Sequence, residues 1–223
     1  MSTSLPKAAR RGLAQEAADL IRSAILAGDL ALGAPLREVE LAAALGISRG
    51  SVREGLAVLE GEGLIRRGWH RGTSVIDIAA RDIEEVYTLR AALDRLAALT
   101  AHRVATPEQF AALDELVDRM AAGLAAQAPT ARLLALDIAF HDRIYAAAGN
   151  ERLRRAWEAV RSQVHLFQLH RVTTGDDHYR AHVVDEHREL AALLRSGDPD
   201  ALARCAEEHV DAARRSLLAD LPA

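Results

Sequence analysis

After Ala80 the chain contains six segments in which apolar residues recur at the spacing of one helix face, and none in which they alternate as in a β-strand. The segments are separated by residues that stop helices, for example Gly149-Asn150 and Gly197-Asp198-Pro199. The expected helices cover about 80–103, 107–127, 130–148, 151–171, 179–196 and 199–219. Such helices bury their apolar faces against one another, which predicts an antiparallel six-helix bundle.

The composition agrees with a helical protein of a reducing compartment. Hydrophobic residues make up 50% of the 223 residues and aromatic residues only 4%, with many alanines and leucines. The single cysteine, Cys205, cannot form an internal disulfide, which favours the cytoplasm. The sequence has no run of about 18 apolar residues, so no membrane span is expected. Its first residues lack the apolar stretch of a signal peptide.

The first 77 residues carry the pattern of a helix-turn-helix. A short helix ends at Gly46, and Ser48 is a good N-cap for the next helix. The apolar stripe of this next helix packs on one side, so the side chains of its first turn face elsewhere. In a helix-turn-helix the second helix presents such N-terminal side chains to the major groove of DNA. The side chains of this first turn are Ser48, Arg49, Ser51 and Arg53.

A predicted β-hairpin follows the second helix directly. Residues 64–77 read as two short strands with Gly68 to Gly72 at the tip. A hairpin at this place would be a wing that lays His70 and Arg71 against the DNA. The alternative is an amphipathic helical hairpin with solvated arginines. The distribution of charge favours the DNA-binding interpretation. Residues 1–76 hold ten Lys or Arg and eight Asp or Glu, whereas residues 77–223 hold eighteen Lys or Arg and twenty-four Asp or Glu.

Four polar residues interrupt the apolar stripes of three predicted helices in the bundle. Asp137 lies within the stripe of the third helix and His141 beside it, while His187 and His209 replace apolar residues in the fifth and last helices. Burying these groups without partners is costly. An Asp and a His four residues apart offer two metal ligands on one helix face, and two more helices can close around them. The alternative is that each histidine is a hydrogen-bonded core residue.

Three imidazoles and one carboxylate suit a divalent transition metal. Zinc is the first choice, and nickel, manganese and iron also fit, whereas calcium prefers oxygen ligands. This ligand set leaves a position open for the carboxylate of a small organic acid. Arg90 lies among apolar residues of the first bundle helix and is the candidate for the far end of that acid. The alternative for Arg90 is a salt bridge with Asp94 four residues later.

The N-terminal pattern resembles the GntR family of bacterial transcription regulators. The resemblance runs through residues 25–77 and includes the segments LGISRGSVREGL and GWHRGTSVID. The residues that it places on DNA are Ser48, Arg49, Ser51 and Arg53 and, at the wing tip, His70, Arg71 and Gly72. Two positions depart from the family pattern. Gly50 leaves only backbone for a contact, and Gly55 replaces the usual alanine at a cost of up to about 1 kcal/mol of helix propensity.

The helical body resembles the FCD domain of the FadR branch of that family. Many FCD domains carry Asp-x-x-x-His on one helix and single histidines on two later helices, and the segments here are DIAFH, DEHREL and EEHVDA. The resemblance implies that Asp137, His141, His187 and His209 bind a metal ion. It also implies that Arg90 contacts the effector, although Asp94 stands where relatives have glutamate. Six helices instead of seven point to the VanR-like subgroup.

The combined expectation is a mainly α protein, with a winged helix-turn-helix at residues 1–77 and an FCD-like helical domain at residues 78–223. Its expected function is ligand-controlled repression or activation of transcription. It would bind double-stranded operator DNA as a homodimer and sense a small carboxylate metabolite at the metal. Two alternatives stay open. One is a metallohydrolase that uses the same four ligands with Asp94 as its base, and the other is a regulator whose metal is purely structural.

Overall fold

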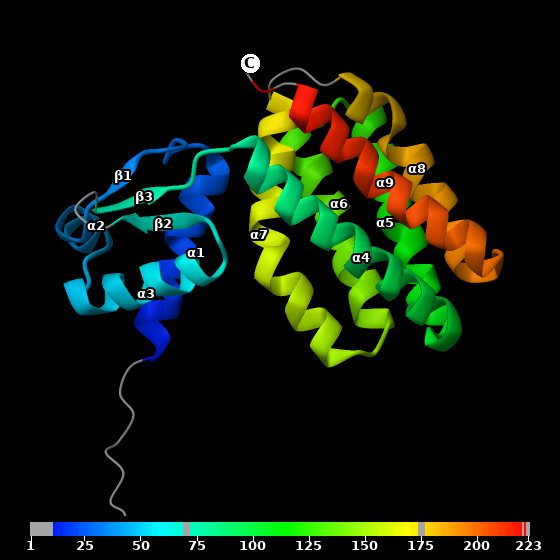
Figure 1. Ribbon diagram of the computed structural model, residues 1–223, viewed down its shortest axis with the longest axis horizontal. Helices are drawn as coiled ribbons and strands as arrows, with labels where there is room; N and C mark the ends of the chain where they lie inside the picture. Colours follow the sequence, from blue (N-terminus) through cyan, green and yellow to red (C-terminus); the bar gives the residue numbers. More distant parts are fainter. Residues whose placement is uncertain (1–10, 69–71, 174–176, 220, 222–223) are drawn as a thin grey trace, which may run out of the picture. The chain divides into compact units, whose positions relative to one another are not determined.

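The computed structural model describes residues 11–68, 72–173, 177–219 and 221, and the chain divides into two compact units, Met1–Asp77 and Ile78–Ala223 (Figure 1). The elements of the first unit are α1 (Arg11–Ala27), β1 (Pro35–Leu36), α2 (Glu38–Leu45), α3 (Arg49–Gly61), β2 (Ile65–Gly68) and β3 (Gly72–Val75). Those of the second unit are α4 (Ala80–Val104), α5 (Pro107–Ala125), α6 (Thr130–Ala147), α7 (Glu151–Thr173), α8 (Asp177–Ser196) and α9 (Pro199–Ala219). This element order confirms the predicted fold class, a winged helix-turn-helix followed by a helical bundle.

Two capping contacts fix the turn between α2 and α3. Gly46 ends α2 in the left-handed conformation, with a φ of 66° that glycine adopts at little cost. Ser48 then caps α3, because its Oγ accepts a hydrogen bond of 3.1 Å from the backbone N–H of Ser51. The helix begins at Arg49, directly after the predicted cap, so the first-turn side chains are held where the helix-turn-helix pattern expects them.

The predicted hairpin is present, and it belongs to a slightly larger sheet. Strands β2 and β3 pair antiparallel, with Gly68 opposite Gly72 at the tip. Strand β1, which the sequence did not predict, pairs with the other edge of β3 and places Pro35 opposite Ser74. A strand of two residues is too short to show an alternating pattern. Proline fits it because an edge strand leaves one row of backbone groups unpaired.

Gly55 is required by packing and is not merely a weak helix former. A Cβ atom at this position would lie 2.8 Å from the backbone oxygen of Ala14 and 3.0 Å from the Cβ of Ala17. Helices α1 and α3 therefore approach each other more closely than any larger residue permits. Glycine lowers the helix propensity of α3, as the sequence suggests, but it is the residue that allows this close contact.

In the second unit the helices begin and end within a few residues of their predicted ranges. The chief differences are that α7 continues to Thr173 and that α8 begins at Asp177. Helix α4 packs along α9, and α5 contacts both α6 and α8 (Figure 1). The bundle interior contains large side chains such as Tyr87, Phe140 and Trp157. None of the helices within the described residues combines the length and the hydropathy that crossing a membrane requires.

Candidate metal centre

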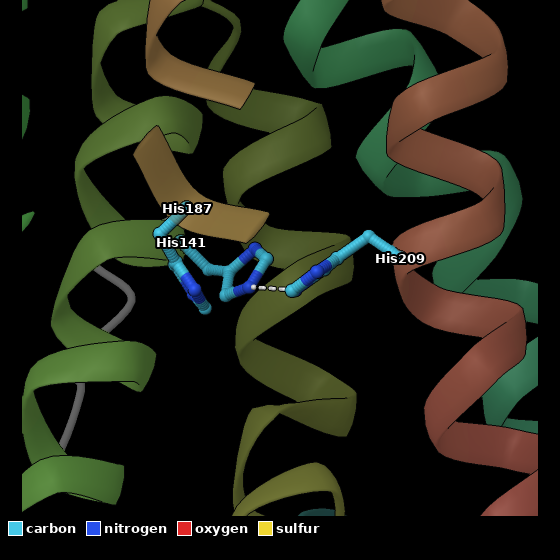
Figure 2. A group of neighbouring side chains, drawn as sticks. All are labelled: His141, His187 and His209. Atoms are coloured by element: carbon cyan, nitrogen blue, oxygen red, sulfur yellow. Dashed lines mark hydrogen bonds between the residues drawn. The ribbon is translucent and has the colours of Figure 1, made fainter. Parts of the chain in front are cut away.

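Three histidines from three helices meet inside the bundle. Helix α6 supplies His141, α8 supplies His187 and α9 supplies His209. Figure 2 shows the three imidazoles pointing toward one another, and their candidate ligand atoms all lie within 4.8 Å of each other. The Nε2 atoms of His141 and His209 lie 3.3 Å apart. Residues more than 60 positions apart in the sequence thus form one cluster.

Asp137 completes the cluster on the α6 side. Its Oδ1 lies 3.6 Å from Nε2 of His141 and 3.7 Å from Nε2 of His187. For metal–ligand bonds of about 2.1 Å, neighbouring ligand atoms lie about 3.0 Å apart around an octahedral ion, which leaves positions open for an acid, and about 3.4 Å apart around a tetrahedral one. The separations of 3.3 to 3.7 Å given above lie close to these values. The structure therefore brings the three predicted histidine ligands within 4.8 Å of one another and places Asp137 beside two of them, while their binding to a metal stays a prediction.

Contacts of the outer ring nitrogen, Nδ1, orient two of the imidazole rings. The Nδ1–H of His187 donates to the backbone oxygen of Val183 at 2.6 Å. The Nδ1 atom of His141 lies 3.3 Å from Oδ2 of Asp94. A proton held on Nδ1 leaves the lone pair of a neutral imidazole on Nε2, the atom that faces the cluster. Carbonyl and carboxylate partners on the outer nitrogen are the usual support of metal-binding histidines.

His209 lies beside a carboxylate that the sequence analysis did not select. Its Nδ1 lies 3.3 Å from Oε2 of Glu186, one residue before His187. Burial lowers the pKa of His209 to about 4, although Glu186 acts in the opposite direction. The imidazole is therefore neutral near pH 7, which is the form that binds a metal ion.

The buried polar atoms of the cluster are suited to bind a cation. Neither Oδ1 of Asp137 nor Nε2 of His187 has a hydrogen-bond partner in the described part of the chain. Burial raises the pKa of Asp137, but His187 and His141 lower it by more, so the carboxyl group is ionised. A buried anion is costly without a positive partner, which can be supplied either by protonated imidazoles or by a bound cation beside neutral ones. The donor set is the one that zinc and similar ions prefer.

Arg90 lies beside the cluster and is fully buried. Its Nε is 3.4 Å from Oδ2 of Asp94, and its Nη2 donates to Nε2 of His141 at 3.0 Å. The guanidinium also lies 5.7 Å and 5.8 Å from the ring centroids of Tyr87 and Trp157. The salt bridge with Asp94 is thus present, and it holds the guanidinium within hydrogen-bonding distance of a candidate ligand atom.

Asp94 is poorly suited to act as a general base. It faces Arg90 and His141, and the hydroxyl of Tyr145 donates a hydrogen bond to its Oδ1. Burial raises the pKa of Asp94, but Arg90 and His141 lower it by a larger amount, so that the pKa is about 2. A general base works best with a pKa near the operating pH. Asp94 therefore orients its neighbours and does not suit proton abstraction.

A cavity of about 340 Å³, including its open mouth, adjoins the cluster on the side of α7 and α8. Asp137, His187 and His209 form part of its wall. The buried polar side chains that complete this wall are Gln168, Arg171 and Tyr179. The sequence analysis missed them, although Arg171 occupies the next position of the α7 stripe after Phe167. The signal in the sequence was this charged residue at a position where the apolar stripe would otherwise continue.

The predicted DNA-contacting residues lie at the start of α3 and at the wing. Arg49 and Arg53 are exposed, and neither guanidinium has an ion pair among the described residues. Ser48 is exposed but its Oγ is occupied by the cap of α3. Ser51 lies next to it, with the two Oγ atoms 3.0 Å apart. Gly72 begins β3, whereas the predicted contacts at positions 70 and 71 lie outside the described residues.

The chain matches known protein families over most of its length. Residues 13–75 match the family of bacterial regulatory proteins named gntR, and residues 85–212 match the FCD domain. A probable repressor of the D-xylose utilization operon from Paenarthrobacter nicotinovorans is 32% identical, over 95% of this chain and 92% of that protein. The Nta operon transcriptional regulator of Aminobacter aminovorans is 29% identical, over 80% of this chain and 81% of that protein. Among solved structures, McbR/YncC of E. coli has a TM-score of 0.79 at 21% identity, covering 94% of this chain and 99% of that one.

Proposed function

The chain belongs to the GntR family of transcription regulators and carries an FCD domain, and from this premise we propose that it is a repressor controlled by a small organic acid bound at a metal ion. The matched proteins are regulators, so the chain is a regulator and not a hydrolase. The acid, the metal and the homodimer belong to the proposal. The observation that carries it is the cluster of three imidazoles within 4.8 Å of one another, with the carboxylate of Asp137 beside two of them.

In this proposal Asp137, His141, His187 and His209 hold a divalent ion, with zinc as the first choice and nickel, manganese or iron as substitutes. The bound ion would supply a positively charged position for a carboxylate. The chain itself contributes the orientation of the ligands, through the contacts of the outer Nδ1 atoms described above. These contacts favour one rotamer and one tautomer of each ring.

The sequence analysis gave Arg90 the far end of the acid, but its guanidinium lies at the cluster, so we assign it instead to the end of the acid that lies at the metal. Its Nη2 donates to Nε2 of His141, and this lone pair is the one that a metal ion uses. The N–H would then need another acceptor, and a carboxylate at the same position provides one. Its Nη1 has no hydrogen-bond partner within the described ranges, so a second donor is available for a bidentate contact.

The first unit would read the operator with the first turn of α3. Arg49 and Arg53 are exposed there, and arginine can grip a guanine through two acceptors. A homodimer would place two such helices on two half-sites of the operator. The acid controls DNA binding only as far as it binds one arrangement of the dimer better than the other. A coupling of about 1–3 kcal/mol is typical and changes operator affinity about 5- to 150-fold.

His187→Ala in the full-length protein tests the metal site. The variant loses one of the four ligands, so we expect its metal content to fall from about one ion per chain to near zero. His182→Ala is the matched control, because His182 is an exposed histidine of the same helix. Metal content is measured by mass spectrometry of the purified proteins. Binding is then measured on DNA that the wild-type protein selects from a random library.

The proposal predicts that His187→Ala still binds this DNA but no longer responds to carboxylates. It is wrong if the wild-type protein contains no stoichiometric metal, or if His187→Ala retains it. A purely structural metal gives a third result. Chelation would then unfold the bundle, seen by circular dichroism, and no carboxylate would change DNA binding by the metal-loaded protein.

A further inference from the structure

We infer that the outer face of α4 is the surface through which two copies of this chain associate, with their α4 helices packed antiparallel. The inference rests on the proposed function, which supplies a second copy as the occupant of this face. It adds the surface, the register of the contact and the residues that hold it. None of these residues belongs to the candidate metal site or to the first turn of α3.

A row of apolar residues lies on the outer face of α4. Leu89 and Leu96 are 46% and 48% exposed and lie two helical turns apart, with the exposed Ala92 between them. Leu99 continues the row and is partly exposed. The outward positions of α8 are polar by contrast: His182, Asp185, Arg188, Glu189 and Arg195. A single exposed leucine is ordinary, but an apolar row along one helix face marks a contact surface.

A groove runs beside this row, between α4 and α9. Thr88, Ala91 and Ala92 line its α4 side with small side chains, and α9 lines the other side with charged residues such as Arg204 and Glu207. The distance between two packed helices depends on the side chains at their contact, so small residues allow a second helix to come close. The groove can therefore receive a leucine side chain from another copy beside Ala92.

The row is complementary to itself when the second α4 runs antiparallel. A two-fold axis midway between Ala92 and Leu96 places Ala92 of each copy opposite Leu96 of the other. The same register places Leu89 opposite Leu99. A large side chain thus meets a small one at the centre, and leucine meets leucine on both sides of it. A two-fold interface requires this kind of self-complementary surface.

The charges at the two ends of the row favour the same arrangement. Glu85 and Arg103 are both exposed and lie about 27 Å apart along α4 at 1.5 Å per residue. Glu85 pairs with Arg81 at 2.7 Å, whereas Arg103 has no ion pair in the described part of the chain. The antiparallel register places Glu85 opposite Arg103 of the other copy, twice per dimer. A parallel pairing in register would instead bring like charges together, which is repulsive.

Analytical ultracentrifugation of the full-length protein without DNA measures the dissociation constant of the dimer. Leu96→Arg places a charge in the apolar row of both copies, so we expect this constant to rise at least about 100-fold. Leu20→Arg is the matched control, because Leu20 is 50% exposed but lies on α1, and its constant should stay at the wild-type value. Circular dichroism shows whether each variant folds.

Exchange of the two charged residues tests their pairing. Glu85→Arg and Arg103→Glu should each raise the dissociation constant about 5- to 30-fold, because each brings like charges together at both ends of the contact. The double variant restores opposite charges across the interface. Its constant should return to within about threefold of the wild-type value.

Disulfide trapping tests the register. The Leu89→Cys and Leu99→Cys proteins, both in a Cys205→Ser background, are oxidised separately and as a mixture. We expect linked dimers in the mixture, because position 89 of one copy lies opposite position 99 of the other. Neither protein should link to itself, because each position lies about 15 Å along the helix from its own copy at 1.5 Å per residue.

The outcomes separate the two proposals. If the wild-type protein is a dimer and Leu96→Arg keeps the wild-type constant, the second copy docks elsewhere, so the inference fails and the proposed homodimer stands. Self-linking of the Leu89→Cys protein, with no link in the mixture, would also refute the antiparallel register. If Leu96→Arg does not fold, the charge exchange and the disulfide trapping decide. A wild-type protein that stays monomeric at every soluble concentration and binds operator DNA as a single copy contradicts the homodimer of the proposed function itself.

Discussion

Replacing Gly55 with alanine should destabilise the helix-turn-helix unit, although alanine is the better helix former. Gly55 lies in the middle of α3, where α1 crosses close to it. An alanine Cβ would lie 2.8 Å from the oxygen of Ala14, 3.0 Å from the Cβ of Ala17 and 3.1 Å from the nitrogen of Ala18. Two of these atoms belong to the backbone of a helix and cannot rotate away.

The size of the effect follows from two opposing contributions. Alanine gains about 1 kcal/mol of helix propensity over glycine. Overpacking that shifts a helix backbone costs about 1–3 kcal/mol, and three close contacts at one position place Gly55→Ala in the upper part of this range. The net loss in the free energy of unfolding is therefore about 1–2 kcal/mol, which is a factor of about 5–30 in the population of opened molecules.

Hydrogen exchange followed by mass spectrometry measures this population in the full-length protein. Peptides from α1 and α3 should exchange about 5- to 30-fold faster in Gly55→Ala than in the wild type, while peptides from α4 to α9 stay unchanged. Gly50→Ala is the control on the same helix, because its Cβ would meet only Oγ of Ser48, at 3.7 Å. Exchange in Gly55→Ala as slow as in the wild type would refute the packing argument.

Three further predictions concern single side chains. Arg49→Ala should reduce the preference for the selected operator over random DNA about 5- to 150-fold, the value of about 1–3 kcal/mol for one base contact, and an unchanged ratio in competition gel shifts would contradict its role as a reader. Arg90→Ala should weaken butyrate binding by the zinc-loaded protein about tenfold or more with zinc content retained, and equal affinity by calorimetry would remove Arg90 from the effector site. Burial and the nearby Glu189 and Glu186 raise the pKa of Cys205 to about 11, so less thiolate is present at pH 8. Iodoacetamide should therefore alkylate Cys205 at least about tenfold more slowly than free cysteine, and a rate equal to that of free cysteine would contradict the assignment.

The helices could be predicted from the sequence because their signals are local. Apolar stripes and boundary residues, such as Gly149 after one helix and Pro199 at the start of another, depend only on neighbours along the chain, and the helices begin and end close to the predicted positions. Strand β1 could not be predicted, because two residues carry no period and the strand exists only through its pairing with β3. The role of Gly55 also depended on a partner helix that is distant in sequence.

The cluster of candidate ligands could be predicted because its members lie in or beside the apolar stripes of three helices. A polar residue such as Asp137 or His187 at a core position requires partners, and several such residues on different helices indicate a common site. The outer contacts carried no comparable signal. Glu186 lies on the partly exposed side of α8 and reads as an ordinary surface residue until α9 brings His209 beside it. Arg171 continued a stripe, but only the folded bundle shows which cavity that stripe faces.

The most direct measurement is X-ray diffraction from crystals of the full-length protein as purified, with data collected on both sides of the zinc absorption edge and, if needed, of the nickel, iron and manganese edges. The account predicts one anomalous peak per chain, about 2.0–2.2 Å from Nε2 of His141, His187 and His209 and from an oxygen of Asp137. Diffraction data that show no ion there, or imidazole nitrogens turned away from a common point, would contradict the proposal that the helical domain senses an acid at a metal ion. The chain would then be a DNA-binding regulator without a metal site.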